Sequence, residues 1–131
     1  MTNQIKGSFD LASVVIGLHR DGEARALEHR DGPPPQIDGF TIGAPLMTRE
    51  PPHGGEMHPD EDELLFLISG KLTVVLEDSD PPRHVELNPG QAVVVPRGIW
   101  HRVVLAAPSQ ILHITPGPGG KHRPVAPNGV A

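Results

Sequence analysis

Apolar residues occur along the chain in short runs that are rich in Val, Ile and Leu. Turn segments such as 78–82 and 88–90, which combine Asp, Ser, Asn, Pro and Gly, separate these runs. Short β-branched runs divided in this way are typical of antiparallel strands in a sandwich or barrel. We therefore predict an all-β fold with strands at 14–18, 40–47, 64–69, 72–76, 84–87, 92–95, 101–105 and 111–115.

A single domain is expected, because a chain of 131 residues supplies one hydrophobic core. Its centre is expected at 45–115, with residues 1–44 adding strands that extend one sheet. No segment keeps a helical period over three turns, and only residues 22–30 have room for a single turn of helix. The tail, 116–131, is dominated by Gly, Pro, Lys, His and Arg and is expected to form no regular structure of its own. It either frays, beginning beyond Pro124, or lies as a strap over the sheet.

The strand predicted at 64–69 is apolar on both faces, whereas a strand with one buried face alternates. If Glu63 points into the barrel, Leu65 and Leu67 point inward as well. The opposite face then needs cover from the N-terminal strands or from a second subunit. The second alternative makes a homodimer the expected assembly. That face consists of Leu64, Phe66 and Ile68.

Charge and composition exclude several classes of function. The net charge is −5 with no basic patch, so nucleic-acid binding is not expected. The absence of Cys excludes disulfides and thiolate metal sites. The N-terminus has no signal-peptide pattern, and the apolar stretch at 11–18 is too short to cross a membrane. We expect a soluble, cytoplasmic protein without a membrane partner.

The segment from Gly90 to His101 has the pattern Gly-x5-Pro-x-Gly-x2-His. Pro96 ends a strand where the loss of a backbone donor is tolerated, and Gly98 provides the turn. His101 then opens the next strand and is expected to face inward. Trp100, its neighbour, is expected to point away and to pack against another sheet or a partner.

An earlier segment has the pattern Glu56-x-His58-x4-Glu63-x6-Gly70. Glu56 and His58 share one face of a strand because side chains alternate along it. Glu63 follows a polar turn at 59–62, and it is preferred to the adjacent acidic residues because it alone leaves six residues before Gly70. Together with the inward-facing histidine of the other segment, these side chains are placed to surround one metal ion in a small barrel.

The two segments resemble the paired motifs of the cupin superfamily, usually written Gly-x5-His-x-His-x3–4-Glu-x6-Gly and Gly-x5-Pro-x-Gly-x2-His-x3-Asn. The resemblance covers roughly 45–115, and within the superfamily the chain looks most like small, single-domain bacterial cupins. It implies a jelly-roll barrel, often dimeric, around a divalent metal ion held by three His and one Glu. The corresponding ligands here are Glu56, His58, Glu63 and His101.

Three positions depart from these motifs: Glu56 replaces a His, Glu50 a Gly, and Leu105 an Asn. The change at position 56 matters most, because two His and two carboxylates make a site with a divalent ion neutral. Such a site is a weaker Lewis acid, and its oxygen ligands favour Mn or Fe(II), with Zn and Ni also possible. Without metal, Glu56 and Glu63 are expected to lie close together, and one of them should hold a proton.

Other interpretations of these residues remain open. Glu56 is alternatively a solvated residue in a protein that has lost its metal, and His53 is alternatively a substitute ligand, although its Pro-rich surroundings favour exposure. His113 either lines the pocket or is a strand residue with its hydrogen bonds satisfied. The pocket is expected to be small and aliphatic, with Leu65, Leu67, Val103 and His113 in its wall.

Two functions follow from this pocket, and the fold does not choose between them. The first is a metal-dependent oxygenase or isomerase acting on a small molecule. The alternative is a non-catalytic module that binds or senses a sugar-like metabolite in a metal-free pocket. A structural dimer with a vestigial pocket follows if Glu56 is no ligand.

Overall fold

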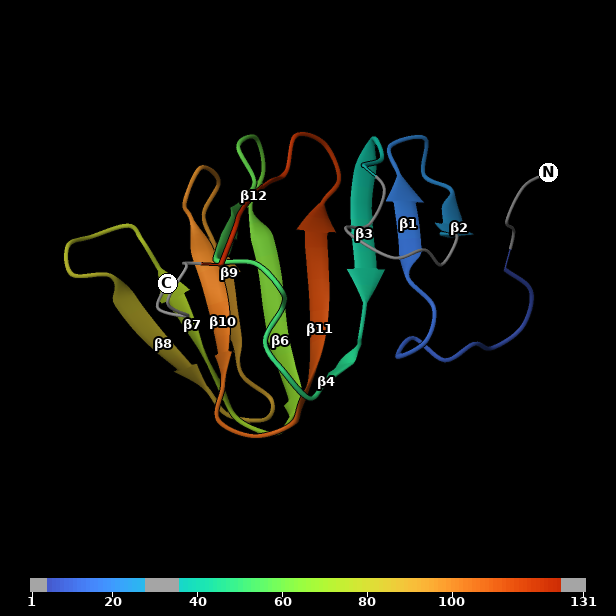
Figure 1. The fold of residues 1–131 in the computed structure, drawn as a ribbon. Coiled ribbons are helices and arrows are strands. Elements are labelled where there is room, and N and C mark those ends of the chain that lie inside the picture. The colour runs from blue at the N-terminus through green and yellow to red at the C-terminus, as the bar shows by residue number, and fades with distance from the viewer. Residues whose placement is uncertain (1–4, 28–35, 126–131) are drawn as a thin grey trace.

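The computed structural model describes residues 5–27 and 36–125 and consists, over these ranges, of strands, turns and loops without a helix. The predicted all-β fold is therefore confirmed. Within the described residues, twelve strands form two antiparallel sheets (Figure 1). The described residues accordingly contain no helix of the length and hydropathy needed to cross a membrane.

The larger sheet has seven strands in the order β2-β1-β3-β11-β6-β9, with β4 paired to β11. The N-terminal strands stand beyond β11 and extend this sheet, as predicted (Figure 1). Its strands are β1 (Ile16–His19), β2 (Ala24–Ala26), β3 (Gly39–Gly43), β4 (Leu46–Met47), β6 (Glu63–Ser69), β9 (Ala92–Val95) and β11 (Ser109–Pro116).

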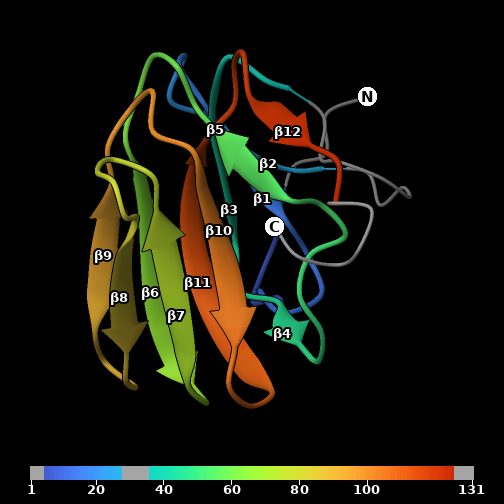
Figure 2. The same ribbon diagram turned by 60° about the vertical axis from the view of Figure 1, so that its left-hand side comes forward.

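The smaller sheet has five strands in the order β12-β5-β10-β7-β8. It faces the β9, β6 and β11 part of the larger sheet, as the rotated view shows (Figure 2). The two sheets make the sandwich of a jelly roll. Its strands are β5 (Gly55–Met57), β7 (Leu72–Leu76), β8 (Arg83–Leu87), β10 (His101–Leu105) and β12 (Lys121–Arg123).

The hydrophobic core lies between the two sheets and is almost entirely aliphatic. Alternating residues of the central strands point into it, so burial alternates along β6. Gly70 turns the chain from β6 to β7 with φ +92°, and a Cβ at this position would collide with Ser109. The buried core residues are Leu65, Leu67, Leu72, Val74, Leu76, Leu87, Val95 and Ile111.

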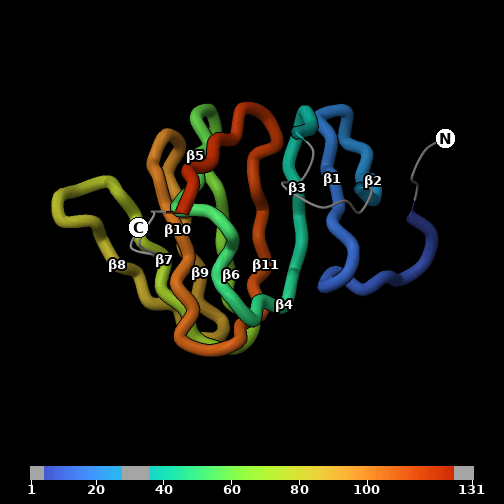
Figure 3. The backbone as a smooth tube through the Cα atoms, in the orientation of Figure 1, coloured from blue at the N-terminus to red at the C-terminus, as the bar shows by residue number. Residues whose placement is uncertain are grey.

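Three predictions about local structure were wrong. Residues 24–26 of the proposed helical turn form β2, and residues 28–30 lie outside the described residues. The strand predicted at 40–47 is divided at Ala44 and Pro45 into β3 and β4. The tail also forms a strand, β12, which returns to pair with β5 (Figure 3). The fraying predicted beyond Pro124 concerns mainly residues that lie outside the described part.

The outer face of β6 has no cover from the N-terminal strands, because these lie beside β11 in the same sheet. Leu64 and Phe66 are half-buried on this face. Ile68 retains 40% of its exposure, and Val94, opposite Leu64 on β9, retains 55%. An apolar surface therefore remains open on the outside of the larger sheet.

Candidate metal centre

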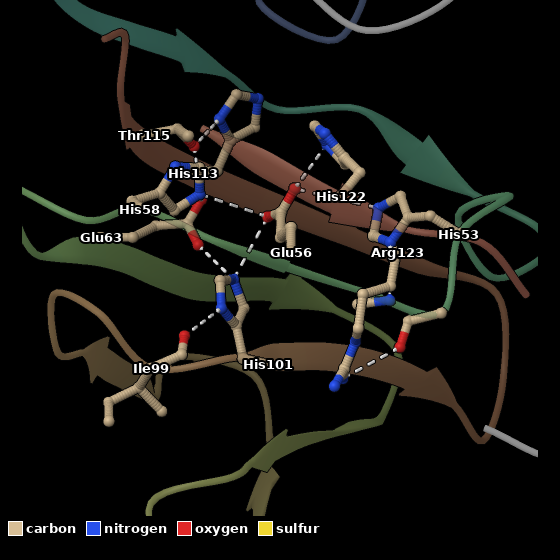
Figure 4. Close-up of polar contacts among 12 residues, drawn as sticks. His53, Glu56, His58, Glu63, Ile99, His101, His113, Thr115, His122 and Arg123 are labelled. Atoms are coloured by element: carbon tan, nitrogen blue, oxygen red, sulfur yellow. Dashed lines mark hydrogen bonds and ion pairs between the residues drawn. The ribbon is translucent and has the colours of Figure 1, made fainter. Parts of the chain in front are cut away.

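Four side chains predicted from the two motifs meet at one end of the barrel (Figure 4). Glu56 comes from β5, His58 follows that strand, and Glu63 and His101 begin β6 and β10. One ligand atom from each lies within 4.8 Å of all the others. We call Glu56, His58, Glu63 and His101 the inner cluster.

Strand pairing places Glu56 at the middle of this arrangement. Its Cα lies directly opposite that of His101 on β10 and that of His122 on β12. Residues opposite one another in antiparallel strands project from the same face of the sheet. The sheet therefore presents a row of His122, Glu56 and His101 toward the interior.

The nitrogen and oxygen atoms of the inner cluster lie at short distances from one another. His101 Nε2 is 2.7 Å from Glu63 Oε1 and 3.2 Å from Glu56 Oε1. His58 Nε2 is 3.6 Å from Glu56 Oε1 and 3.7 Å from Glu63 Oε2. Atoms that bind one ion at about 2.1 Å lie about 3.0–3.4 Å apart. The observed spacing brackets this value, so the cluster fits a divalent ion after small adjustments.

Burial makes this cluster unusual. The exposed fractions are 6% for His58, 2% for Glu63 and 1% for His101. Both ring nitrogens of His58, and Oε1 of Glu63, are buried without a hydrogen bond, although Glu63 Oε1 forms an ion pair with His101 Nε2 at 2.7 Å. Unpaired buried polar atoms are destabilising. A bound cation would satisfy His58 Nε2 and Glu63 Oε1, which face the cluster, and would leave His58 Nδ1 unpaired.

Ion pairing within the cluster fixes its charge in the absence of metal. Burial alone would lower the pKa of His101, but its close contacts with the carboxylates of Glu56 and Glu63 outweigh burial and raise that pKa to about 10. Burial likewise raises the pKa of Glu56, yet contacts with His101 and His58 more than reverse this and hold it far below its usual range. Glu56 is therefore ionised in the absence of metal and is not the carboxylate predicted to hold a proton, and the imidazolium of His101 lies against both carboxylates.

Hydrogen bonds behind the cluster orient two of its members. His101 Nδ1 lies 3.3 Å from the Ile99 carbonyl, to which it donates, and this leaves Nε2 directed at the cluster. Thr115 Oγ1 donates to Glu63 Oε2 at 2.6 Å and accepts from His113 Nδ1 at 2.8 Å. Burial lowers the pKa of His113, so this histidine is neutral. Such supporting contacts are typical of sites that hold metal.

A cavity of about 220 Å³ adjoins the inner cluster. Leu65, Val103 and His113 are among its lining residues, and His113 also has its hydrogen bond to Thr115. Leu67 was predicted in this wall but lies fully buried in the core, opposite Ile111 and outside the cavity lining. Two residues further along β6, it reaches the closed part of the barrel. The cavity is mostly apolar, with Met47 and Ile111 in its wall.

The acidic residues next to Glu63 have other partners. Glu61 forms an ion pair with Arg20, and Asp62 accepts a hydrogen bond from the Arg97 amide at 2.9 Å. The choice of Glu63 from its position relative to Gly70 thus agrees with its burial. Trp100 contacts the tail, because the Arg123 guanidinium lies 4.5 Å from its ring centre.

Two further histidines contact Glu56 from outside the inner cluster. His122 Nε2 lies 3.3 Å, and His53 Nε2 3.8 Å, from Glu56 Oε2 (Figure 4). His53 was expected to be exposed, but its side chain retains only 20% exposure. No motif pointed to His122, which belongs to a tail predicted to be irregular. We call His53, Glu56 and His122 the outer cluster; its ligand atoms also lie within 4.8 Å of one another.

The fold and the inner cluster together define a small jelly-roll barrel with a His and carboxylate cluster inside it. A family model described as Cupin domain matches residues 46–115, which is more than half of the chain. The chain therefore belongs to the cupin family. A search of curated proteins found no match.

Several solved structures share the fold at low sequence identity. A cupin-2 domain containing protein from Shewanella frigidimarina has TM-score 0.51 and 20% identity over 68% of this chain and 83% of its own. Peruvianin-I, a cysteine peptidase from Thevetia peruviana latex, has TM-score 0.54 and 17% identity over 66% of this chain and 56% of its own.

Oxalate decarboxylase from Bacillus subtilis, described with Mn(II) centres, has TM-score 0.51 and 20% identity over 63% of this chain. The aligned part is only 23% of the decarboxylase chain. Such distant similarity supports the fold alone.

Proposed function

We propose that this cupin binds one divalent metal ion through Glu56, His58, Glu63 and His101 and acts as a metal-dependent enzyme on a small molecule. The observation that carries this proposal is the convergence of four ligand atoms in which buried atoms of His58 and Glu63 have no hydrogen bond. Buried polar atoms without partners are rare, and a metal site accounts for two of them, His58 Nε2 and Glu63 Oε1.

The surrounding residues would hold the ligands in place. The Ile99 carbonyl would keep the His101 ring proton on Nδ1 and leave Nε2 free to bind the ion. Thr115 donates to Glu63 and limits rotation of its carboxylate, and His113 in turn fixes the hydroxyl direction. Two carboxylates and two neutral histidines would neutralise a divalent charge and favour Mn or Fe(II), although Zn and Ni also suit this ligand set.

The ion would supply either Lewis acidity for an isomerase or redox chemistry for an oxygenase. The chain's own residues define what can bind beside it. Apolar side chains, including Met47, Leu65, Val103 and Ile111, dominate the wall of the 220 Å³ cavity. We infer a small, largely apolar substrate with an oxygen able to reach the cluster.

Metal analysis of protein purified without chelator tests this proposal. We expect close to one Mn, Fe, Ni or Zn ion per inner cluster, and loss of that ion in a His58→Ala, His101→Ala double variant. His84→Ala, which removes an exposed histidine on β8, is the matched control and should retain it. Metal content that is unchanged by the double variant would refute the assignment, provided that circular dichroism shows the variant to be folded.

A metal-free module that binds a sugar-like metabolite is the second candidate. It is favoured by the position of His101 Nε2, which pairs with Glu56 and Glu63 so that much of the cluster charge is balanced without an ion. Protein that carries no metal after such purification, and that retains a small organic molecule detectable by mass spectrometry, would support this candidate over the enzyme.

We also propose that two copies associate through the outer face of the larger sheet. The exposure of Ile68 and Val94, beside half-buried Leu64 and Phe66, supports this association. A second copy would remove this apolar surface from water, which is favourable.

A further inference from the structure

We propose that Glu56 is a bridging ligand and that its outer oxygen, with His53 and His122, holds a second divalent metal ion. The proposal rests on the proposed function only in sharing Glu56 with the inner cluster. It assigns a role to two histidines that the inner cluster does not use, one before β5 and one on β12.

The two carboxylate oxygens of Glu56 face different sets of histidines. Oε1 lies 3.2 Å from His101 Nε2 and 3.6 Å from His58 Nε2. Oε2 lies 3.3 Å from His122 Nε2 and 3.8 Å from His53 Nε2. A carboxylate with one oxygen in each of two ligand groups has the arrangement required to bridge two ions. A histidine at position 56 would offer only one ligand atom to the interior.

The outer cluster has the ligand number and spacing of an open metal site. The rings of His53 and His122 lie 5.0 Å apart between centroids and are inclined at 66°, so their nitrogens approach Glu56 from different directions. Two imidazoles and one carboxylate oxygen suit Zn²⁺ or Co²⁺ and leave at least one position for water. His122 is 36% exposed, so an ion can enter from solvent.

The tail holds His122 in position through contacts that do not depend on metal. The backbone of β12 pairs with β5 at Lys121, His122 and Arg123. Arg123 also forms an ion pair with Glu77 and stacks near Trp100. The outer ligand thus comes from a paired strand and not from an unattached segment.

One contact opposes binding at the outer cluster. His53 Nδ1 accepts a hydrogen bond from the Gly55 amide at 3.2 Å, which places the ring proton on Nε2, toward Glu56. Coordination through Nε2 must move this proton to Nδ1 and open the contact with Gly55. We therefore expect the outer ion to bind after the inner ion and with lower affinity.

Titration of the full-length, metal-free chain with Zn²⁺, followed by calorimetry and by metal counting after gel filtration, tests the proposal. Two ions per chain are expected for the wild type and one for the His53→Ala, His122→Ala double variant. The Glu56→His variant is also expected to bind one ion, since it restores an inner ligand and removes the bridge. Lys121→Ala and His84→Ala are matched controls and should still bind two.

Each other outcome separates the two proposals. Binding of one ion by the wild type, unchanged in the His53, His122 variant, would overturn the outer site and leave the inner site intact. One ion that is lost in this variant, but retained in the His58→Ala, His101→Ala variant, would support the outer site and overturn the inner one. Binding of no ion by the wild type would overturn both. Co²⁺ absorption spectra provide an independent readout, because the first and second equivalents should give different bands, and the variant should lack the second.

Discussion

The two ends of the barrel share strands but differ in what their side chains do. β6 begins with Glu63 in the inner cluster and continues to Leu67 in the core, and β10 likewise begins with His101 and ends at Leu105. At the aliphatic end the side chains pack against one another in the core. At the polar end, atoms of His58 and Glu63 are buried without hydrogen bonds. Burial of apolar surface at one end stabilises a fold that can tolerate an unsatisfied cluster at the other.

The largest effect is expected from the aliphatic end. Leu72 is fully buried between the sheets, and Leu72→Ala should lower the free energy of unfolding by about 2–5 kcal/mol through lost burial and a cavity. Urea denaturation measures this change. Metal content per folded molecule should stay constant, and a parallel loss of metal would show that the two ends are not separable.

A smaller loss of stability is expected when the hydrogen bonds that orient Glu63 are removed. Thr115→Val removes the hydroxyl that links Glu63 and His113, which should lower unfolding free energy by about 1–3 kcal/mol. It should also weaken metal binding about 10–100-fold. Thr41→Val, directly opposite on β3, is the control. Equal loss of metal affinity in both variants would contradict a specific role for the Thr115 hydroxyl.

A change of pH affects the stability of the polar end and leaves the aliphatic end unchanged, without any mutation. Folding raises the pKa of His101 from 6.5 to about 10, because its carboxylate partners outweigh burial. Protonated His101 therefore stabilises the metal-free fold fully below pH 6.5, and this contribution is lost as the pH rises through 10. The melting temperature should fall over this interval, and fall less in Glu56→Gln. An equal decline in both proteins would show that this ion pair does not govern the pH response.

The smallest effect on folding is expected on the outer face. Ile68→Lys and Val94→Lys change exposed positions, so unfolding free energy should move by only about 0.5 kcal/mol or less in the monomer. Light scattering should report a dimer for the wild type and a monomer for the double variant. A monomeric wild type at micromolar concentration would show that this apolar face needs no partner.

Much of the fold could be predicted because its strands carry their own apolar pattern. β7 and β10 have the bounds predicted from the sequence, and β6 and β11 differ only at their ends. β12 could not be predicted, since Lys-His-Arg has no apolar alternation and the strand exists through backbone pairing with β5 and contacts of Arg123. Such long-range pairing leaves no local signal.

The candidate site shows the same division. His58, Glu63 and His101 occupy motif positions, so sequence spacing was enough to bring them together in the prediction. Glu56 was ambiguous, because spacing did not show whether it is solvated, and its partners settle its position between two clusters. His122 lies far along the chain, and only the strand register opposite Glu56 reveals it.

The outer cluster of His53, Glu56 and His122 also has an evolutionary consequence. A change at position 56 removes the carboxylate that both histidines contact, so residues 53, 56 and 122 should not change independently. Among related chains, those with Glu at this position should carry His at the other two, and those with His at this position should be free to lose them. Correlated substitutions at positions 53, 56 and 122, which belong to separate segments of the chain, would then record how this site evolved.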